Sequence, residues 1–175
     1  MAQDILIVDD ERDIRNLISG ILNDEGLTTR DAANADEALA AVRARLPSLV
    51  ILDIWLQGSR IDGLQILDQL QQEYPLLPVV MISGHGNIET AVNAIRKGAY
   101  DFIEKPFEAD RMMVIVNRAL QAARLKREND ELREENRQLH EQLRQLRDEN
   151  RRLASAAEVE LNPSPSPRRK ESPRA

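Results

Sequence analysis

The 175-residue sequence contains no cysteine, which excludes disulfide frameworks, thiolate metal sites and cysteine nucleophiles. It also lacks an apolar run near the length of roughly 18 residues that a membrane-spanning helix needs. The start Met1-Ala2-Gln3-Asp4 lacks the basic-then-apolar layout of a signal peptide. We therefore expect a cytoplasmic protein that makes no contact with a membrane.

Nucleotide-binding motifs are missing as well. No Walker A sequence occurs, so we do not expect a nucleotide hydrolase. Gly84 and Gly86 flank His85, but Glu89 stands where a dinucleotide fingerprint needs its third glycine. His85 has no second histidine nearby, and we expect it to be a surface loop residue rather than a phosphohistidine or a metal ligand.

Charge is distributed unevenly along the chain. Residues 1–120 contain 19 acidic and 11 basic side chains, a net charge of −8, whereas residues 121–157 and 158–175 each carry +1. An acidic domain of this kind binds nucleic acids poorly when no specific contacts are made.

Short apolar runs alternate with segments of helical periodicity over the first part of the chain. The predicted strands cover residues 4–8, 27–31, 49–52, 79–82 and 100–104. The predicted helices between them cover residues 14–22, 36–45, 63–74 and 87–97. Strands that alternate with helices predict an α/β fold in which a doubly wound parallel sheet is covered on both faces. Ligands bind such sheets beyond the carboxyl ends of the strands.

Polar residues follow several of the predicted strands. Asp9 and Asp10 follow the first, Asp53 the third and Ser83 the fourth, and Lys105 follows the fifth. Side chains at these positions converge on one edge of a parallel sheet. Clustered carboxylates repel one another unless a hard cation lies among them, and Mg²⁺ suits such oxygen ligands. Asp53 is then the natural nucleophile for a phosphoryl group, with Lys105 as the neutralising charge.

Each of these residues also has an ordinary structural interpretation. Asp9 or Asp10 could cap the helix that follows, Ser83 could bond to its own backbone, and Lys105 could be a solvated surface charge. Because these residues occur together at the ends of several predicted strands, the functional interpretation is favoured.

Four segments carry a resemblance to a known family: VDDE at 8–11, the LD dipeptide that ends in Asp53, ISGHG at 82–86 and GAYDFIEKPF at 98–107. Together they resemble the receiver domain of bacterial two-component response regulators over about residues 3–120. The resemblance implies a flavodoxin-like sheet in the order 2-1-3-4-5. It also implies a sensor histidine kinase as the phosphoryl donor, and a phosphoacceptor protein rather than an enzyme in the usual sense.

The resemblance assigns roles to individual residues. Asp53 is the phosphoacceptor, Asp10 binds Mg²⁺ directly, and Asp9 binds it through a water molecule. The backbone carbonyl of Trp55 completes the metal shell. The remaining assignments are Ser83 as a hydrogen-bond partner and Lys105 as an ion-pair partner of the phosphoryl group, Phe102 as the switch aromatic, and a cis Lys105-Pro106 bond.

The loop after Asp53 departs from the common pattern. It reads IWLQGSRIDG, about two residues longer than usual and without proline. With SGHGNIETAVNAIRKGAYDFIEKPF, this loop resembles the NtrX group of nitrogen-regulatory response regulators.

A long helix is predicted from about residue 109 to 157, because no glycine or proline occurs between Pro106 and Pro163. Leucine recurs every seven residues in it, which predicts a parallel dimeric coiled coil over residues 121–157. Glu128 would face Arg133 of the second helix, and Glu135 would face His140. The predicted seam comprises Leu125, Asn129, Leu132, Asn136, Leu139, Leu143, Leu146, Asn150 and Leu153.

The sequence does not determine how such a protein passes its signal on. NtrX regulators continue from a similar segment into an ATPase that contacts sigma-54 and a DNA-binding domain, whereas residues 158–175 are a Pro/Ser/Arg-rich tail that we expect to be disordered. We therefore expect a truncated or divergent member, or a stand-alone regulator that acts through dimer contacts. The alternatives are a constitutive coiled-coil scaffold whose receiver does not signal, and a transcription regulator that contacts DNA through the coil or tail.

Overall fold

The computed structural model describes residues 3–85, 87–163 and 165–167. Two compact units are present, Met1–Glu128 and Asn129–Ala175, and the long last helix contributes residues to both. The predicted change of organisation near residue 120 therefore falls close to the end of the first unit. The residues of the tail at 164 and 168–175 lie outside the described part.

The first unit is built on five parallel strands in the order β2-β1-β3-β4-β5, which confirms the expected order. The strands are β1 (Asp4–Val8), β2 (Thr28–Ala32), β3 (Leu49–Asp53), β4 (Val79–Ser83) and β5 (Asp101–Glu104). The helices are α1 (Arg12–Asp24), α2 (Ala35–Ala44), α3 (Gly63–Glu73), α4 (Ile88–Arg96) and α5 (Ala109–Leu161).

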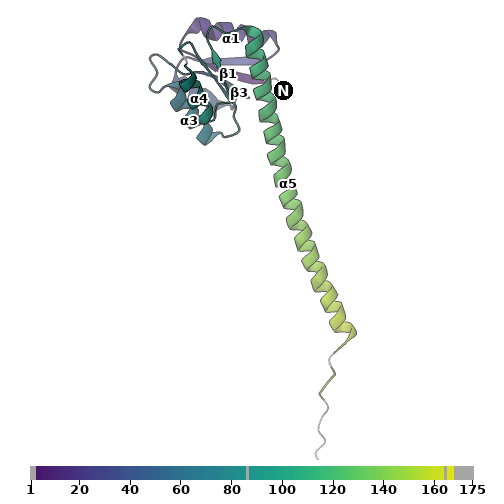
Figure 1. Ribbon diagram of the computed structural model, residues 1–175. Coiled ribbons are helices and arrows are strands. Elements are labelled where there is room, and N and C mark those ends of the chain that lie inside the picture. The colour runs from purple at the N-terminus through teal and green to yellow at the C-terminus, as the bar shows by residue number, and fades with distance from the viewer. Residues whose placement is uncertain (1–2, 86, 164, 168–175) are drawn as a thin grey trace, which may run out of the picture. The chain divides into compact units, whose positions relative to one another are not determined.

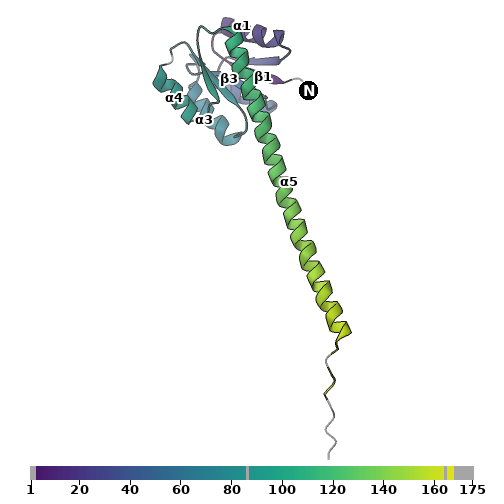
Figure 2. The same cartoon turned by 45° about the vertical axis from the view of Figure 1, so that its right-hand side comes forward.

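Helices cover both faces of this sheet, as Figures 1 and 2 show. On one face α1 and the first turns of α5 pack on Ile7, Ile51 and Ile82. On the other face α2, α3 and α4 pack on Val8, Leu52 and Met81. The central strands β3 and β4 are buried along their whole length. Continuous apolar sequence in these strands is the expected result of burial on both sides.

Side-chain caps begin three of the helices. Asn34 accepts the N–H of Glu37 ahead of α2, and Asn87 accepts the N–H of Thr90 ahead of α4. Asp62 and Gln65 form a reciprocal capping box ahead of α3. Because each cap holds one of the otherwise unpaired first N–H groups, it fixes where the chain leaves the loop at the carboxyl edge of the sheet.

The last helix ends at Leu161, beyond the end near residue 157 that the sequence predicted. The added residues, 158–161, include glutamate and leucine, which are good helix formers, and the next proline comes at Pro163. Within the described ranges, no helix combines the length and the apolar character that crossing a bilayer requires.

Candidate phosphoacceptor site

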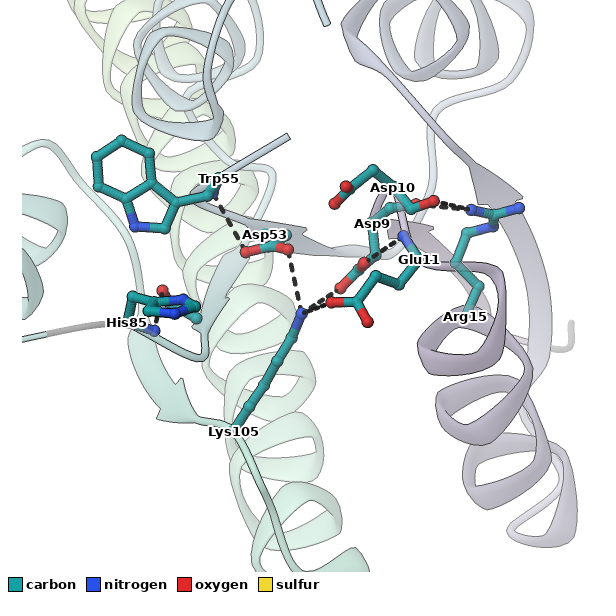
Figure 3. A network of polar contacts seen from close by, with 9 residues as sticks. Asp9, Asp10, Glu11, Arg15, Asp53, Trp55, His85 and Lys105 are labelled. Carbon is teal, nitrogen blue, oxygen red and sulfur yellow. Dashed lines mark hydrogen bonds and ion pairs between the residues drawn. The ribbon is translucent and has the colours of Figure 1, made fainter. Parts of the chain in front are cut away.

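The polar residues that follow the strands meet at one edge of the sheet. Asp9 comes after β1, Asp53 ends β3, and Lys105 follows β5. The ammonium of Lys105 lies 2.8 Å from Oδ2 of Asp9 and 3.1 Å from Oδ2 of Asp53 (Figure 3). The parallel register places these positions together, since Val8 pairs with Leu52 and Asp53 pairs with Ile82.

Three carboxylates form a group that suits a divalent cation. Asp9, Asp10 and Asp53 each offer an oxygen, and these oxygens all lie within 4.8 Å of one another. Asp9 and Asp53 are buried, whereas Asp10 is partly exposed. Buried carboxylates this close repel each other, and a hard cation that prefers oxygen ligands would neutralise them. The residues present therefore fit Mg²⁺.

The acidity of Asp53 reflects this crowding. Burial and the negative charge of Asp9 raise the pKa of Asp53 from 3.8 to about 6, against the opposing influence of Lys105 and of the Trp55 N–H. Burial by itself would lower the pKa of Lys105, but its hydrogen bond to Asp9 and the charges of Asp53 and Asp9 raise it above the ordinary value. Lys105 is therefore a cation between two carboxylates.

Two residues to which the sequence analysis gave no role support this group. The N–H of Glu11 donates to Oδ1 of Asp9 at 2.8 Å, and the Glu11 carboxylate lies 3.7 Å from the Lys105 ammonium. The guanidinium of Arg15 donates to the backbone carbonyl of Asp9 at 2.8 Å and to that of Asp10 at 3.3 Å. Arg15 thereby holds the β1–α1 loop. The only sequence signal was its position, one helical turn after Glu11.

The residues around Asp53 come from two further loops. The backbone N–H of Trp55 donates to Oδ1 of Asp53 at 3.2 Å, and the Trp55 side chain is 54 % exposed. Ser83 ends β4, is fully buried, and accepts the N–H of His85 at 3.2 Å. In Figure 3, Trp55 and His85 lie on the same side of Asp53, opposite the β1–α1 loop.

Phe102 lies in β5, where it pairs with Met81 of β4 and packs against the core cluster on the α2, α3 and α4 face. It is partly buried, so the structure places it between the core and the surface. The Lys105-Pro106 peptide bond is cis. The sequence-predicted residues at the strand ends are thus brought together, whereas Phe102 is separated from the strand of Asp53 by β4.

Gly63 is a further residue that the sequence analysis missed. Its N–H donates to the carbonyl of Ile54 at 2.8 Å, and a Cβ atom at this position would lie 2.0 Å from the carbonyl oxygen of Asp53. Only glycine allows α3 to begin so close to the backbone of Asp53. A glycine at the start of a predicted helix was the available signal.

The predicted seam residues lie on α5. The leucines at the predicted seam, from Leu125 to Leu153, are each between 50 and 63 % exposed. The nearby ion pairs on this helix join Arg124 to Glu128, Arg137 to Glu134 and Arg144 to Glu141. All three pairs are local contacts within one helix.

Known proteins similar to this chain share its first three quarters. The nitrogen assimilation regulatory protein NtrX of Azorhizobium caulinodans is 66 % identical over 132 residues, which are 75 % of this chain and 29 % of that protein. The crystal structure of NtrX from Brucella abortus in complex with ADP is 66 % identical, with a TM-score of 0.73, over 75 % of this chain and 30 % of that one.

The crystal structure of the NtrX receiver domain from Brucella abortus alone is 68 % identical, with a TM-score of 0.66, and covers 67 % of this chain and 98 % of that one. This chain therefore spans about 30 % of the length of the longer relatives. Residues 5–117 match the family described as the response regulator receiver domain. Together with the sheet order and the acidic edge formed by Asp9, Asp10 and Asp53, this match shows that the chain belongs to the response regulator receiver domain family.

Proposed function

We propose that this protein accepts a phosphoryl group on Asp53 from a phosphohistidine of a sensor histidine kinase, and that it signals as a parallel coiled-coil dimer. One observation supports the proposal that Asp53 accepts the phosphoryl group. Asp53 is 4 % exposed and ends the central strand β3, and it is flanked by the ammonium of Lys105 and by two further carboxylates.

The proposed chemistry uses the residues of the acidic edge. Asp10 and Asp53 would bind Mg²⁺ directly and Asp9 would bind it through a water molecule, with the Trp55 carbonyl as a further ligand. When bound, the ion would neutralise charge on the phosphoryl oxygens and on the carboxylates. An oxygen of Asp53 forms the new bond to phosphorus, while the bond from phosphorus to the imidazole nitrogen of the kinase breaks. The departing imidazole keeps that electron pair and takes up a proton. Lys105, already 3.1 Å from Asp53, balances the charge of the acyl phosphate.

The conformational response involves Ser83 and Phe102. Ser83 is the buried polar residue at the end of β4, the strand beside the acceptor strand, and its hydroxyl can donate to a phosphoryl oxygen. Phe102 lies on β5, which pairs with β4, so a shift at the end of β4 can reach its side chain. We assign to Phe102 the coupling between the acceptor and the surface near α4 and β5.

The dimer proposal rests first on the leucines of α5. Six leucines on one stripe of a 53-residue helix remain at least 50 % exposed. Such a stripe loses its contact with water when a second helix packs on it. Asparagine at the alternate seam positions 129, 136 and 150 lowers the stability of a coiled coil but selects its register and its number of chains.

Charge decides the orientation of the two helices. The positions that follow the seam leucines carry Lys126, Arg133, His140 and Arg147, and the positions that precede the other seam residues carry Glu128, Glu135, Gln142 and Glu149. In a parallel pair the first set faces the second, whereas an antiparallel pair places each set against itself. Opposite charges therefore meet only in the parallel arrangement, and a second copy of this chain satisfies it.

Mass spectrometry after incubation with acetyl phosphate and Mg²⁺ tests the acceptor. We expect an adduct of about 80 Da in the wild-type protein. Asp53→Asn should abolish it, whereas Asp24→Asn, at an exposed carboxylate that ends α1, should retain it. A wild-type protein that gains no adduct, or an Asp53→Asn variant that still gains one, would leave a constitutive coiled-coil scaffold as the function.

A further inference from the structure

The loop of residues 54–62 is tied to the start of α2. The hydroxyl oxygen of Ser59 accepts the backbone N–H of Ala35 at 3.0 Å, and Ala35 is the first residue of α2. The first N–H groups of a helix have no acceptor within the helix itself, so Ser59 provides one from a different loop. Arg60 lies 3.3 Å from Asp36 beside this contact, but both side chains are largely exposed, and such a pair contributes little.

The same loop reaches the acceptor at its other side. The N–H of Trp55 donates to Oδ1 of Asp53 at 3.2 Å. Between Trp55 and Ser59 the chain makes one tight turn, in which the N–H of Ser59 donates to the carbonyl of Leu56 at 3.3 Å and Gly58 has a φ of +73°. A turn with glycine at its third position leaves the backbone little freedom. A displacement of Ser59 is therefore transmitted to the Trp55 peptide.

The far end of the loop is closed independently. The N–H of Gly63 donates to the carbonyl of Ile54 at 2.8 Å, and Asp62 caps α3. These contacts hold the base of the loop, whereas the Ser59 hydroxyl is the contact that holds its tip against α2.

We propose that Ser59 is a positioning residue for the metal and phosphoryl site. This inference rests on the proposed function and deepens it. Ser59 acts through the Trp55 peptide, whose N–H contacts Asp53 and whose carbonyl is expected in the metal shell. A serine that only capped α2 would change the stability of the protein but not its affinity for Mg²⁺.

Titration of the full chain with Mg²⁺ tests the proposal, because Trp55 is the sole tryptophan and its fluorescence reports on the loop directly. Ser59→Ala should raise the apparent Kd for Mg²⁺ by about three- to tenfold, the range that the loss of one hydrogen bond produces. The rate of adduct formation with acetyl phosphate should fall by a similar factor at low Mg²⁺ and recover at saturating Mg²⁺.

Two further variants test whether the Ser59 hydroxyl is the cause of the change in Kd. Ser59→Thr keeps a hydroxyl and should restore the wild-type Kd. Ser19→Ala removes a serine hydroxyl that contacts Thr29 at 2.6 Å, away from the loop, and should leave the Kd unchanged. Circular dichroism and urea unfolding of each variant separate a folding defect from an effect on the site.

The outcomes distinguish this proposal from the proposed function. A Ser59→Ala protein that is less stable but binds Mg²⁺ and gains the adduct like the wild type overturns the positioning role. Failure of Ser59→Thr to rescue shows that the hydroxyl is not the operative group and also overturns it. A wild-type protein with neither a Mg²⁺ response nor an adduct refutes the proposed function, and the role of Ser59 falls with it.

Discussion

The ammonium of Lys105 lies 3.1 Å from Oδ2 of Asp53, although 52 positions separate the two residues in the chain. The same ammonium lies 2.8 Å from Oδ2 of Asp9, so one cation serves two buried carboxylates. In the absence of a metal ion, Lys105 is the principal positive charge that these carboxylates contact. Substitution of Lys105 should therefore affect both the stability of the protein and the proposed phosphoryl transfer to Asp53.

We expect Lys105→Met to lower the free energy of unfolding by about 1.5–3 kcal/mol in EDTA, because Asp9 and Asp53 lose a charged hydrogen-bond donor. Addition of Mg²⁺ should recover part of this loss, since the ion replaces the missing positive charge. Urea unfolding with and without Mg²⁺ measures both effects.

Lys97→Met is the matched control. Lys97 lies 2.6 Å from Asp68, but both side chains are about a third exposed or more, so its loss should cost less than about 1 kcal/mol and should not depend on Mg²⁺. Equal effects of the two variants would contradict a special role for Lys105.

The raised pKa of Asp53 predicts a pH dependence of stability in EDTA. Since the folded protein holds this proton more tightly than the unfolded chain, the charged carboxylate destabilises the fold at pH values above about 6, and protonation removes the penalty as the pH falls toward 3.8. The shift from 3.8 to about 6 corresponds to at most about 3 kcal/mol.

Asp53→Asn isolates this contribution from those of the other carboxylates. In EDTA at pH 7.5 the variant should unfold at a higher urea concentration than the wild type, and the difference should shrink as the pH approaches 4. Mg²⁺ should favour the wild type at pH 7.5, because only the wild type keeps the full set of carboxylates. A difference that is constant from pH 4 to 7.5 would argue against the raised pKa.

Gly63→Ala should disrupt the acceptor strand. The added Cβ would lie 2.0 Å from the Asp53 carbonyl oxygen, so either the start of α3 or the end of β3 must move. We expect a loss of about 1–3 kcal/mol or more in stability and slower adduct formation on Asp53. Thermal unfolding and the acetyl phosphate assay measure these effects.

Gly20→Ala gives the opposite expectation. Gly20 lies within α1, and apart from its chain neighbours and the nearby backbone of the same helix, no described atom lies within 4 Å of the position of its added Cβ. The substitution should therefore stabilise the protein by about 0.5–1 kcal/mol through helix propensity. Similar effects of the two glycine substitutions on stability would show that the fold does not require glycine at position 63.

The coiled coil is tested by charges in its seam. Leu132→Lys together with Leu139→Lys should convert a dimer to a monomer in light scattering, because two lysines would have to be buried opposite two others. Gln138→Lys together with Gln145→Lys adds the same charge to the same helix outside the seam and should leave the dimer intact. A wild-type protein that already has the mass of a monomer would refute the dimer proposal.

Much of the fold was accessible from local sequence. The apolar runs of β3 and β4 are continuous because both faces of these strands are buried. This pattern can be recognised in the sequence without knowing which elements pack against the strands. Asp9, Asp53, Ser83 and Lys105 could be placed at the strand ends for the same reason. The heptad spacing of Leu125 to Leu153 is likewise a property of the chain alone.

Tertiary structure decided the contacts that join distant loops. Arg15 holds the β1–α1 backbone, Gly63 leaves no room for a Cβ atom beside the Asp53 carbonyl, and Ser59 accepts the N–H of Ala35. The positions of these residues in the sequence do not by themselves indicate these contacts. Strand and helix periodicity follows from local geometry, whereas such hydrogen bonds depend on how the loops pack against one another. Sequence thus determined the strand that ends in Asp53, and packing determined the geometry that holds Lys105 against Asp53.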